Sequence, residues 1–415
     1  MKREIKRVVI TGLGAITPLG NNVKDFWQNL LAAKSGISKI TQFDASAFDS
    51  RIAGEVKGFD PLGFIPPKEA RRMEPFAQFA VAAAKEALID SKLSLDKEDV
   101  DRIGVLIGSG IGSLLVIERE HNIFLAKGPS KFSPFLIPML IVNEAAGWVS
   151  IILGLKGPNS CVTTACASGS HSIGDAFKII QRGDADIMFT GGTESCITTL
   201  GVGGFCALKA LSKRNDEPER ASRPFDKDRD GFVIAEGAGI VALEELEHAL
   251  KRNAPIYCEM VGYGMSSDAY HITAPDPEGD GARRAMQAAL KDARIKTEEV
   301  SYINSHGTST LLNDKLETLA IKNLFGAYAK KIAVNSTKSM TGHPLGAAGG
   351  MEFIVSCLSV KNDVVHQTVN YENPDPECDL DYVPNHARNM KVNVAMSNSL
   401  GFGGHNATLV VKKFK

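Results

Sequence analysis

The chain has 415 residues, of which 44% are hydrophobic and 23% charged, and its formal net charge is −1. This length exceeds what one compact core usually contains, so we expect two domains or a duplicated unit. The balanced charge argues against a general nucleic-acid-binding role, because such proteins carry a marked basic excess.

The seven cysteines form an odd set without short paired spacings. Such a set in a long chain indicates a reducing compartment, and we expect a cytoplasmic protein. No Cys-x-x-Cys or His-x-x-x-His pair occurs in the sequence, so no zinc site is expected. Residues 1–14 lead directly into a strand pattern without a signal-peptide core. Residues 134–155 are the most apolar stretch, but Pro138, Asn143 and Glu144 interrupt it, and no membrane span is predicted.

The first half begins with a predicted strand at residues 8–14, VVITGLG, which ends in a glycine pair. A helix is predicted at residues 75–94 and a strand within residues 100–113. A β-rich run then leads to Cys166, and apolar residues at helical spacing predict a helix that follows it and ends at Gly183. Residues 231–245 form a glycine-rich turn into a closing strand.

The second half repeats these elements in the same order. A strand at residues 258–264, CEMVGYG, is followed by a helix at residues 281–296 and a strand within residues 300–310. His343 then takes the place of Cys166, each with a glycine three residues later, and the chain ends in a second closing strand. Chance similarity of α/β units is the alternative, but the matched order favours duplication. We therefore predict an α/β protein with largely parallel, buried sheets in two pseudo-symmetric halves, residues 1–253 and 254–415.

Cys166 lies in TTACASGSHSIG, residues 163–174, among small side chains at a predicted helix start. A helix N-terminus favours the thiolate, which is the nucleophilic form of cysteine. Small neighbours leave room for a substrate thioester and for backbone donors at its oxygen. The alternative is a buried structural cysteine, which is the more common outcome for an isolated motif.

His306 lies in NSHGTST, and His343 lies in NSTKSMTGHPLGAAGG together with Lys338. Two neutral imidazoles could each donate an N–H to one oxyanion, as preorganised donors do where negative charge develops. Glu352 follows on the next predicted helix, flanked by apolar residues. It could orient the histidine pair or accept a hydrogen bond from Lys338.

These segments, with SNSLGFGGHNATLVV at residues 397–411, resemble the β-ketoacyl-[acyl-carrier-protein] synthases of the Cys-His-His class over essentially the whole chain. The likeness is greatest to synthase II, the elongating condensing enzyme of type II fatty-acid synthesis. The resemblance implies a thiolase-like fold, with two duplicated halves in a layered αβαβα body, and a homodimer. It implies an acyltransferase that condenses an acyl thioester with malonyl-acyl carrier protein and needs no cofactor.

By the same resemblance, Cys166 accepts the acyl group, and His306 and His343 bind the malonyl thioester oxygen with Lys338 as supporting charge. Glu352 organises that pair. A bound monovalent cation, Na⁺ or K⁺, is implied near four residues: Asn304, Glu352, Ser397 and Asn398.

The remaining implied residues bind substrate. Thr308 and Thr310 match positions that hydrogen-bond the phosphopantetheine arm, and Ile111 and Phe205 match positions that line the acyl pocket. Phe402 matches the gate over the cysteine, and its N–H joins that of Cys166 as the oxyanion hole. The sequence departs from many relatives at His405, where they carry threonine.

Several alternatives share parts of this pattern. A thiolase would need a second cysteine in the C-terminal glycine-rich loop, a synthase III initiator would have asparagine in place of His343, and an inactive chain-length partner would lack Cys166. A non-enzymatic binder of acyl carrier protein would not need Cys166, His306 and His343 together. A polyketide ketosynthase shares every motif and stays open. The basic stretches at residues 68–76 and 209–214 are either docking surfaces for the acidic carrier or solvated faces.

Overall fold

The computed structural model describes residues 5–415; residues 1–4, at the start of the stretch where no leader is expected, lie outside it. The main strands are β1 (Val8–Ile16), β4 (Ile103–Gly108), β5 (Asn159–Ser160), β6 (Ile187–Glu194), β7 (Gly237–Glu245), β8 (Cys258–Ser267), β9 (Tyr302–Asn304), β10 (Ala333–Asn335), β13 (Val394–Gly401) and β14 (His405–Lys412). They form one sheet in the order β10-β9-β13-β14-β8-β1-β7-β6-β4-β5. Two small sheets pair β2 (Ser38–Lys39) with β3 (Ile52–Ala53), and β11 (Val364–Val365) with β12 (Arg388–Asn389).

The helices of the described residues are α1 (Val23–Leu31), α2 (Pro67–Ala70), α3 (Pro75–Asp90), α4 (Leu114–Lys127), α5 (Leu136–Leu140), α6 (Glu144–Leu153), α7 (Ser168–Arg182), α8 (Thr199–Ala207), α9 (Leu246–Lys251), α10 (Asp280–Ala293), α11 (Leu311–Phe325), α12 (Lys338–Thr341) and α13 (Ala348–Asn362). Gly183 adopts the left-handed conformation at the end of α7, as predicted. No helix in residues 5–415 is both long and apolar enough to span a lipid bilayer.

The strand order confirms the duplication. From the sheet edge inward, the first half runs β5-β4-β6-β7-β1 and the second β10-β9-β13-β14-β8, so corresponding strands occupy corresponding places. The two first strands, β1 and β8, pair with each other through residues 8–10 and 258–260, which joins the halves at the centre. The boundary between residues 253 and 254 stays a prediction.

The expectation of largely parallel sheets is wrong. Among the strands of residues 5–415, parallel pairing is confined to β4 with β5 and β6, and to β9 with β10 and β13. The closing strands β7 and β14 and the first strands β1 and β8 pair antiparallel. In the second half, β14 follows β13 through a tight turn, and such a connection can only join antiparallel strands.

Both first strands carry glycines because a helix of the same half lies directly on them. A Cβ atom at Gly14 would stand 1.9 Å from the carbonyl oxygen of Ala83 on α3, and one at Gly264 would stand 2.1 Å from that of Ala285 on α10. No side chain fits at such distances. The glycine pairs noted in the sequence therefore set how closely each outer helix approaches its sheet.

Strands β1 and β8 each contain a bulge at the matching place. One residue of β1 has no partner on β7, and one residue of β8 has no partner on β14. The two skipped residues are Thr11 and Val261. Two positions later, the N–H of Leu13 donates to Asp90 on α3, and the N–H of Tyr263 donates to Asp292 on α10, each at 2.9 Å. A helical carboxylate thus satisfies the amide that the bulge removes from the ladder.

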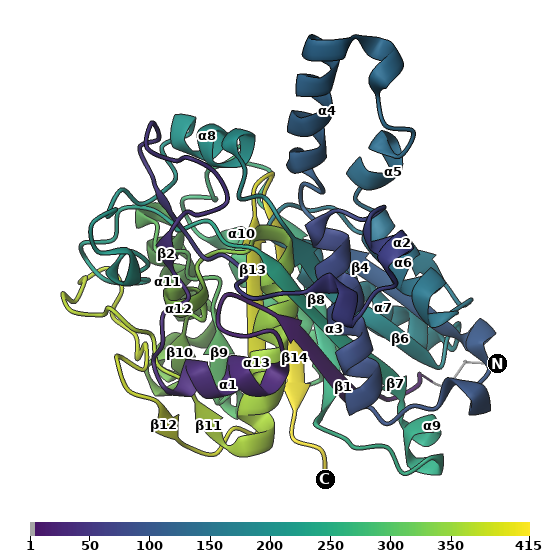
Figure 1. Ribbon diagram of the computed structural model, residues 1–415. Coiled ribbons are helices and arrows are strands. Elements are labelled where there is room, and N and C mark those ends of the chain that lie inside the picture. Colours follow the sequence, from purple (N-terminus) through teal and green to yellow (C-terminus); the bar gives the residue numbers. More distant parts are fainter. Residues whose placement is uncertain (1–4) are drawn as a thin grey trace.

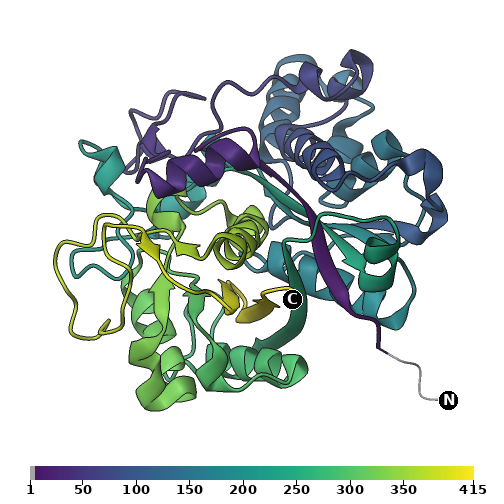
Figure 2. The same ribbon diagram turned by 90° about the horizontal axis from the view of Figure 1, so that it is seen from below.

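Helices and strands alternate in five layers (Figures 1 and 2). Helices α3 and α6 cover the outer face of the first half, and α10 and α11 cover that of the second. Between the halves lie α7 and α13, which contact each other and strands of both halves. Helices α4 and α5 project from this body (Figure 1). The layered α/β architecture agrees with the expected fold class, and it places the starts of α7 and α13 together in the interior.

Candidate active site

One cavity of about 490 Å³ contains most of the predicted site residues and draws them from both halves. Its lining includes Cys166, His306, His343, Thr308, Thr310, Phe402, Ile111 and Phe205. Lys338, which donates to His306, and its ion-pair partner Glu352 are buried outside this lining. The structure thus brings the predicted catalytic and substrate-binding residues into one site.

Cys166 is held by a strained turn. Ala165 has φ of +50°, in the left-handed region that non-glycine residues rarely adopt, and α7 begins two residues after the cysteine. The hydroxyl of Ser168 accepts the N–H of Thr164 at 2.9 Å and closes the turn. A Cβ atom on Gly401 would stand 2.7 Å from the carbonyl oxygen of Thr164, so the loop that carries Phe402 lies directly on this turn.

The thiol of Cys166 is protonated in the resting protein. Burial raises its pKa to about 12, although the charge of Lys338 and the N–H groups of Phe402 and of Cys166 itself act to lower it. The expectation that the helix start favours the thiolate is therefore wrong for the resting state, because desolvation of the sulfur outweighs it. Both N–H groups are nevertheless directed at the sulfur, where a thioester oxygen bound to it would need donors.

His306 and His343 lie beside the thiol. The cysteine sulfur and one ring nitrogen of each histidine all lie within 4.8 Å of one another. The two rings are nearly perpendicular, with centroids 5.2 Å apart, and Phe232 packs edge-on against His343. Burial and the charge of Lys338 hold the pKa of both histidines well below the usual range. Both rings are therefore neutral at physiological pH, and each carries one N–H.

Lys338 decides which nitrogen of His306 carries the proton. Its ammonium group donates to the carbonyl oxygen of His306 at 2.6 Å and lies 3.4 Å from Nδ1 of the same residue. An ammonium group can only donate, so Nδ1 accepts and the proton remains on Nε2. This tautomer makes His306 a hydrogen-bond donor and disfavours metal binding by the three side chains, which would need a free lone pair.

Glu352 forms a buried ion pair with Lys338. Burial raises the pKa of Glu352 to about 7, and the neighbouring Lys338 acts in the opposite direction. The sequence analysis missed a second carboxylate, Glu317 on α11, which accepts the N–H groups of His306 at 2.8 Å and Gly307 at 2.9 Å. Its signal was the pair of acidic residues Asp314 and Glu317, one helical turn apart and both on the buried side of α11.

The residues expected near a cation are buried together at the edge of β9. Ser397 lies opposite Asn304 across the β9–β13 pair. Asn304 Oδ1, Ser397 Oγ and Glu352 Oε2 find no hydrogen-bond partner among the described residues. Asn398 differs, because its side chain bonds Glu317 and Thr408. Three unsatisfied buried oxygens fit a small cation in chemical type.

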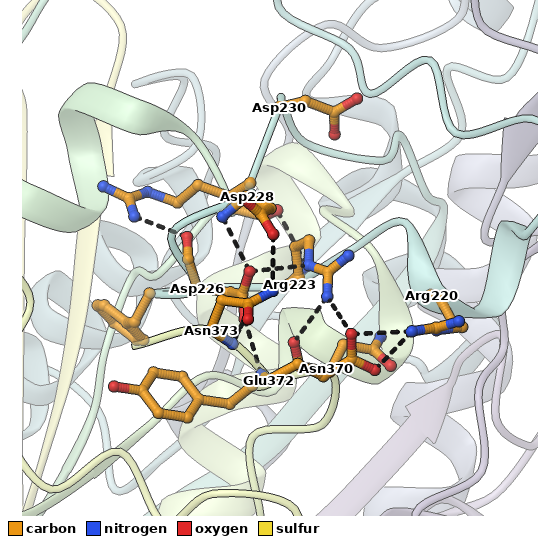
Figure 3. A network of polar contacts seen from close by, with 12 residues as sticks. Arg220, Arg223, Asp226, Asp228, Asp230, Asn370, Glu372 and Asn373 are labelled. Atoms are coloured by element: carbon orange, nitrogen blue, oxygen red, sulfur yellow. Dashed lines mark hydrogen bonds and ion pairs between the residues drawn. The ribbon is translucent and has the colours of Figure 1, made fainter. Parts of the chain in front are cut away.

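A polar network fixes the turn that carries Thr308 and Thr310. Figure 3 shows Arg223 reaching Glu372, at 2.8 Å, from the loop that crosses between the halves. From the same loop, Arg229 donates to the carbonyl oxygens of Thr310 and Leu311, both at 3.0 Å. This part of the cavity lining is thus held by buried guanidinium groups and not by packing alone.

The chain matches the family model described as β-ketoacyl synthase, N-terminal domain, over residues 5–249, and that of the C-terminal domain over residues 257–372. It is 58% identical to a 3-oxoacyl-[acyl-carrier-protein] synthase 2 of Synechocystis sp. over 412 residues, and 55% identical to one of Coxiella burnetii over 410 residues; each alignment covers 99% of both chains.

Solved structures agree. A β-ketoacyl synthase from Burkholderia phymatum has a TM-score of 0.92 at 36% identity, covering 99% of this chain and 100% of that one. A type II polyketide ketosynthase, determined in complex with its acyl-carrier protein, has a TM-score of 0.92 at 37% identity with the same coverage. Motifs, fold, site and relatives lead to one assignment: the chain belongs to the β-ketoacyl synthase family.

Proposed function

We propose that this enzyme extends fatty acyl chains by two carbons, through decarboxylative Claisen condensation of an acyl thioester with malonyl-acyl carrier protein. The observation that carries the proposal is one thiol beside two neutral imidazoles in a cavity shared by both halves. The relatives at 55–58% identity are named 3-oxoacyl-[acyl-carrier-protein] synthase 2, whereas the solved type II polyketide ketosynthase is 37% identical. The polyketide alternative is therefore not better supported.

In the first step, the sulfur of Cys166 attacks the carbonyl carbon of the acyl thioester. The bond to the carrier sulfur breaks, and the thiol proton of Cys166 passes to the departing carrier thiolate. The thioester oxygen rests on the N–H groups of Cys166 and Phe402, which already point at the sulfur. A protonated resting thiol suits this exchange, because the proton it loses is the one that the leaving group needs.

In the second step, malonyl-carrier loses its carboxylate as CO₂, and the electrons of the broken C–C bond form an enolate. His306 and His343 donate N–H groups to the enolate oxygen. The enolate carbon then attacks the acyl carbonyl on Cys166, a C–C bond forms, and the bond from the carbonyl carbon to the cysteine sulfur breaks. The thiolate released on Cys166 takes a proton from solvent and the thiol is restored. Lys338 contributes by fixing the His306 tautomer, and Glu352 balances its charge.

The substrate contacts follow from the lining of the cavity. Thr308 and Thr310, which line it, are the proposed contacts of the phosphopantetheine arm, and Ile111 and Phe205, also in the lining, are the proposed wall of the acyl pocket. Phe402 lines the same cavity and is the proposed gate. Lys209, exposed at the rim, supports the stretch 209–214 as a docking surface for the acidic carrier, and exposed Lys68 and Arg71 support the stretch 68–76.

Three further parts of the proposal rest on single features. The unsatisfied oxygens of Asn304, Ser397 and Glu352 support a monovalent cation held with Asn398. Exposed apolar side chains on and around α4 and α5 support a homodimer through this projection: Phe124, Leu125, Phe132, Ile137 and Ile141. Seven free cysteines support a cytoplasmic location.

Mass spectrometry after incubation with acyl-carrier substrate tests the proposal. We expect the acyl label on Cys166 and loss of condensation in Cys166→Ala, with malonyl decarboxylation retained because the enolate site is separate. Cys206→Ala, a half-buried cysteine on α8, is the matched control and keeps both labelling and condensation. Label on any other cysteine would contradict the assignment.

A further inference from the structure

Glu194, the last residue of β6, is fully buried and accepts hydrogen bonds from separate segments of the chain. Its Oε1 accepts from the hydroxyl of Ser109 at 2.8 Å and the N–H of Ile111 at 3.2 Å. Its Oε2 accepts from the N–H groups of Gly110 at 2.8 Å and Gly346 at 3.0 Å. Because every one of these partners donates, the group acts as an ionised carboxylate.

The two segments that meet on Glu194 serve different steps of the reaction. Ile111 lines the cavity where the acyl chain is expected, and Gly346 follows His343 by three residues. The segments also touch directly, since a Cβ atom on Gly346 would stand 2.4 Å from the nitrogen of Gly110. One side chain therefore connects the wall of the acyl pocket to the turn that carries a decarboxylation residue.

That turn is strained and needs such support. Leu345, between His343 and Gly346, has φ of +45°, which costs about 1–3 kcal/mol for a non-glycine residue. Strained backbone persists only where its surroundings hold it. Burial raises the pKa of Glu194, and the hydrogen bonds from Ser109, Gly110, Gly346 and Ile111 oppose this.

The second half contains a similar arrangement, with the donor N–H groups at the matching place and the carboxylate supplied by α11 and not by a strand. Strand β4 corresponds to β9, and after β9 the N–H groups of two consecutive residues, His306 and Gly307, donate to the buried carboxylate of Glu317. After β4, the N–H groups of Gly110 and Ile111 donate to Glu194 in the same way. In the second half this arrangement positions a catalytic histidine.

We propose that Glu194 is a positioning residue that couples the acyl pocket to the decarboxylation site. An acyl chain that displaces Ile111 changes the hydrogen bonds to Glu194, and the shared carboxylate passes the change to the turn after His343. Malonyl decarboxylation then responds to the loading of Cys166. The inference rests on the proposed function, in which Ile111 walls the acyl pocket.

The test measures CO₂ release from malonyl-carrier by the full-length enzyme, with and without acylation of Cys166, and takes the ratio of the two rates. In Glu194→Gln, one carboxylate oxygen is replaced by an amide NH₂. This NH₂ can only donate, so it cannot accept the hydrogen bonds that the oxygen accepted. We expect the ratio to fall about fivefold or more, the lower end of usual coupling between sites, while Glu86→Gln leaves it within about twofold. Glu86 is a matched control, because its carboxylate also accepts two backbone N–H groups, from Ala15 and Val23, and neither lines the cavity.

If Glu194→Gln loses stability but keeps the wild-type ratio, Glu194 is purely structural and the inference is wrong. If that variant does not fold, Ser109→Ala decides: it removes one donor to the carboxylate, and it must shift the ratio in the same direction. A wild-type ratio near one also refutes the coupling. Failure of the proposed function is distinguishable, because Cys166 would then not be acylated at all.

Discussion

Replacing Lys338 by methionine removes the ammonium group between Glu352 and His306 and keeps most of the side-chain volume. Lys338 is 1% exposed, so its partner Glu352 would be left as an unpaired buried carboxylate. Removal of one partner from a buried pair costs about 3–5 kcal/mol of unfolding free energy. Malonyl decarboxylation should also fall, because Nδ1 of His306 loses the donor that fixes its tautomer.

The loss of stability should depend on pH. The folded-state pKa of Glu352 is already raised to about 7, above that of an unfolded glutamate, so its contribution to stability is present at low pH and is lost as pH rises through 7. Without Lys338 this pKa rises further. The difference in unfolding free energy between Lys338→Met and wild type should therefore be larger at about pH 8 than at about pH 6.

Urea denaturation measures the stability effect, and CO₂ release measures the activity. Lys338→Met with Glu352→Gln removes both charges, and we expect it to recover much of the lost stability but none of the decarboxylation. Lys322→Met, which breaks the half-exposed pair with Asp379, is the control and should cost at most about 1 kcal/mol. The reasoning fails if Lys338→Met is no more costly than this control, or if the double variant regains activity.

Three further predictions concern the two histidines of the site, Phe402, and His248 on α9. Alanine at His306 or His343 should lower condensation on the order of 100-fold or more and leave acylation of Cys166 intact; normal decarboxylation by both variants would exclude their role. Phe402→Ala should keep or raise decarboxylation by unloaded enzyme while condensation falls, and an unchanged ratio of the two activities would indicate a static turn. The hydrogen bond to Glu244 raises the pKa of His248. The wild type should therefore be more stable than His248→Gln below about pH 6.5, and this difference should be lost as pH rises through the raised pKa. Thermal unfolding of both proteins across this pH range measures the difference.

The parts of the site that the sequence predicted depend on local features. A cysteine among small residues before a helix, or a histidine after a short strand, is visible in ten or fifteen residues, and the family resemblance that these segments carry grouped Cys166, His306 and His343. The duplication was visible for the same reason, since each glycine pair is required by a helix of its own half.

The parts that the sequence did not predict depend on contacts between distant segments. Glu194 and Glu317 look like ordinary carboxylates next to strand and helix residues, and only the fold shows which backbone N–H groups they accept. The state of the Cys166 thiol was predicted from the helix start, yet burial of the sulfur raises its pKa, although the N–H of Phe402 acts in the opposite direction. The antiparallel closing strands were missed because strand and helix alternation alone does not specify direction.

The duplicated fold explains why the proposed nucleophile and a proposed oxyanion donor meet at this depth. Cys166 and His343 precede the two inner helices at corresponding places, and the glycines three residues after them touch: a Cβ atom on Gly169 would stand 2.9 Å from the carbonyl oxygen of Gly346. Glycine at both positions lets the starts of α7 and α13 approach closely, so the side chains just before them converge. The thiol of one half and the imidazole of the other then lie within 4.8 Å of each other, close enough for the two steps proposed above to share one site. Glu194 and Glu317 hold the remaining loops of each half against this contact, which is why we expect a change at either carboxylate to alter the coordination of the two steps before it alters either step alone.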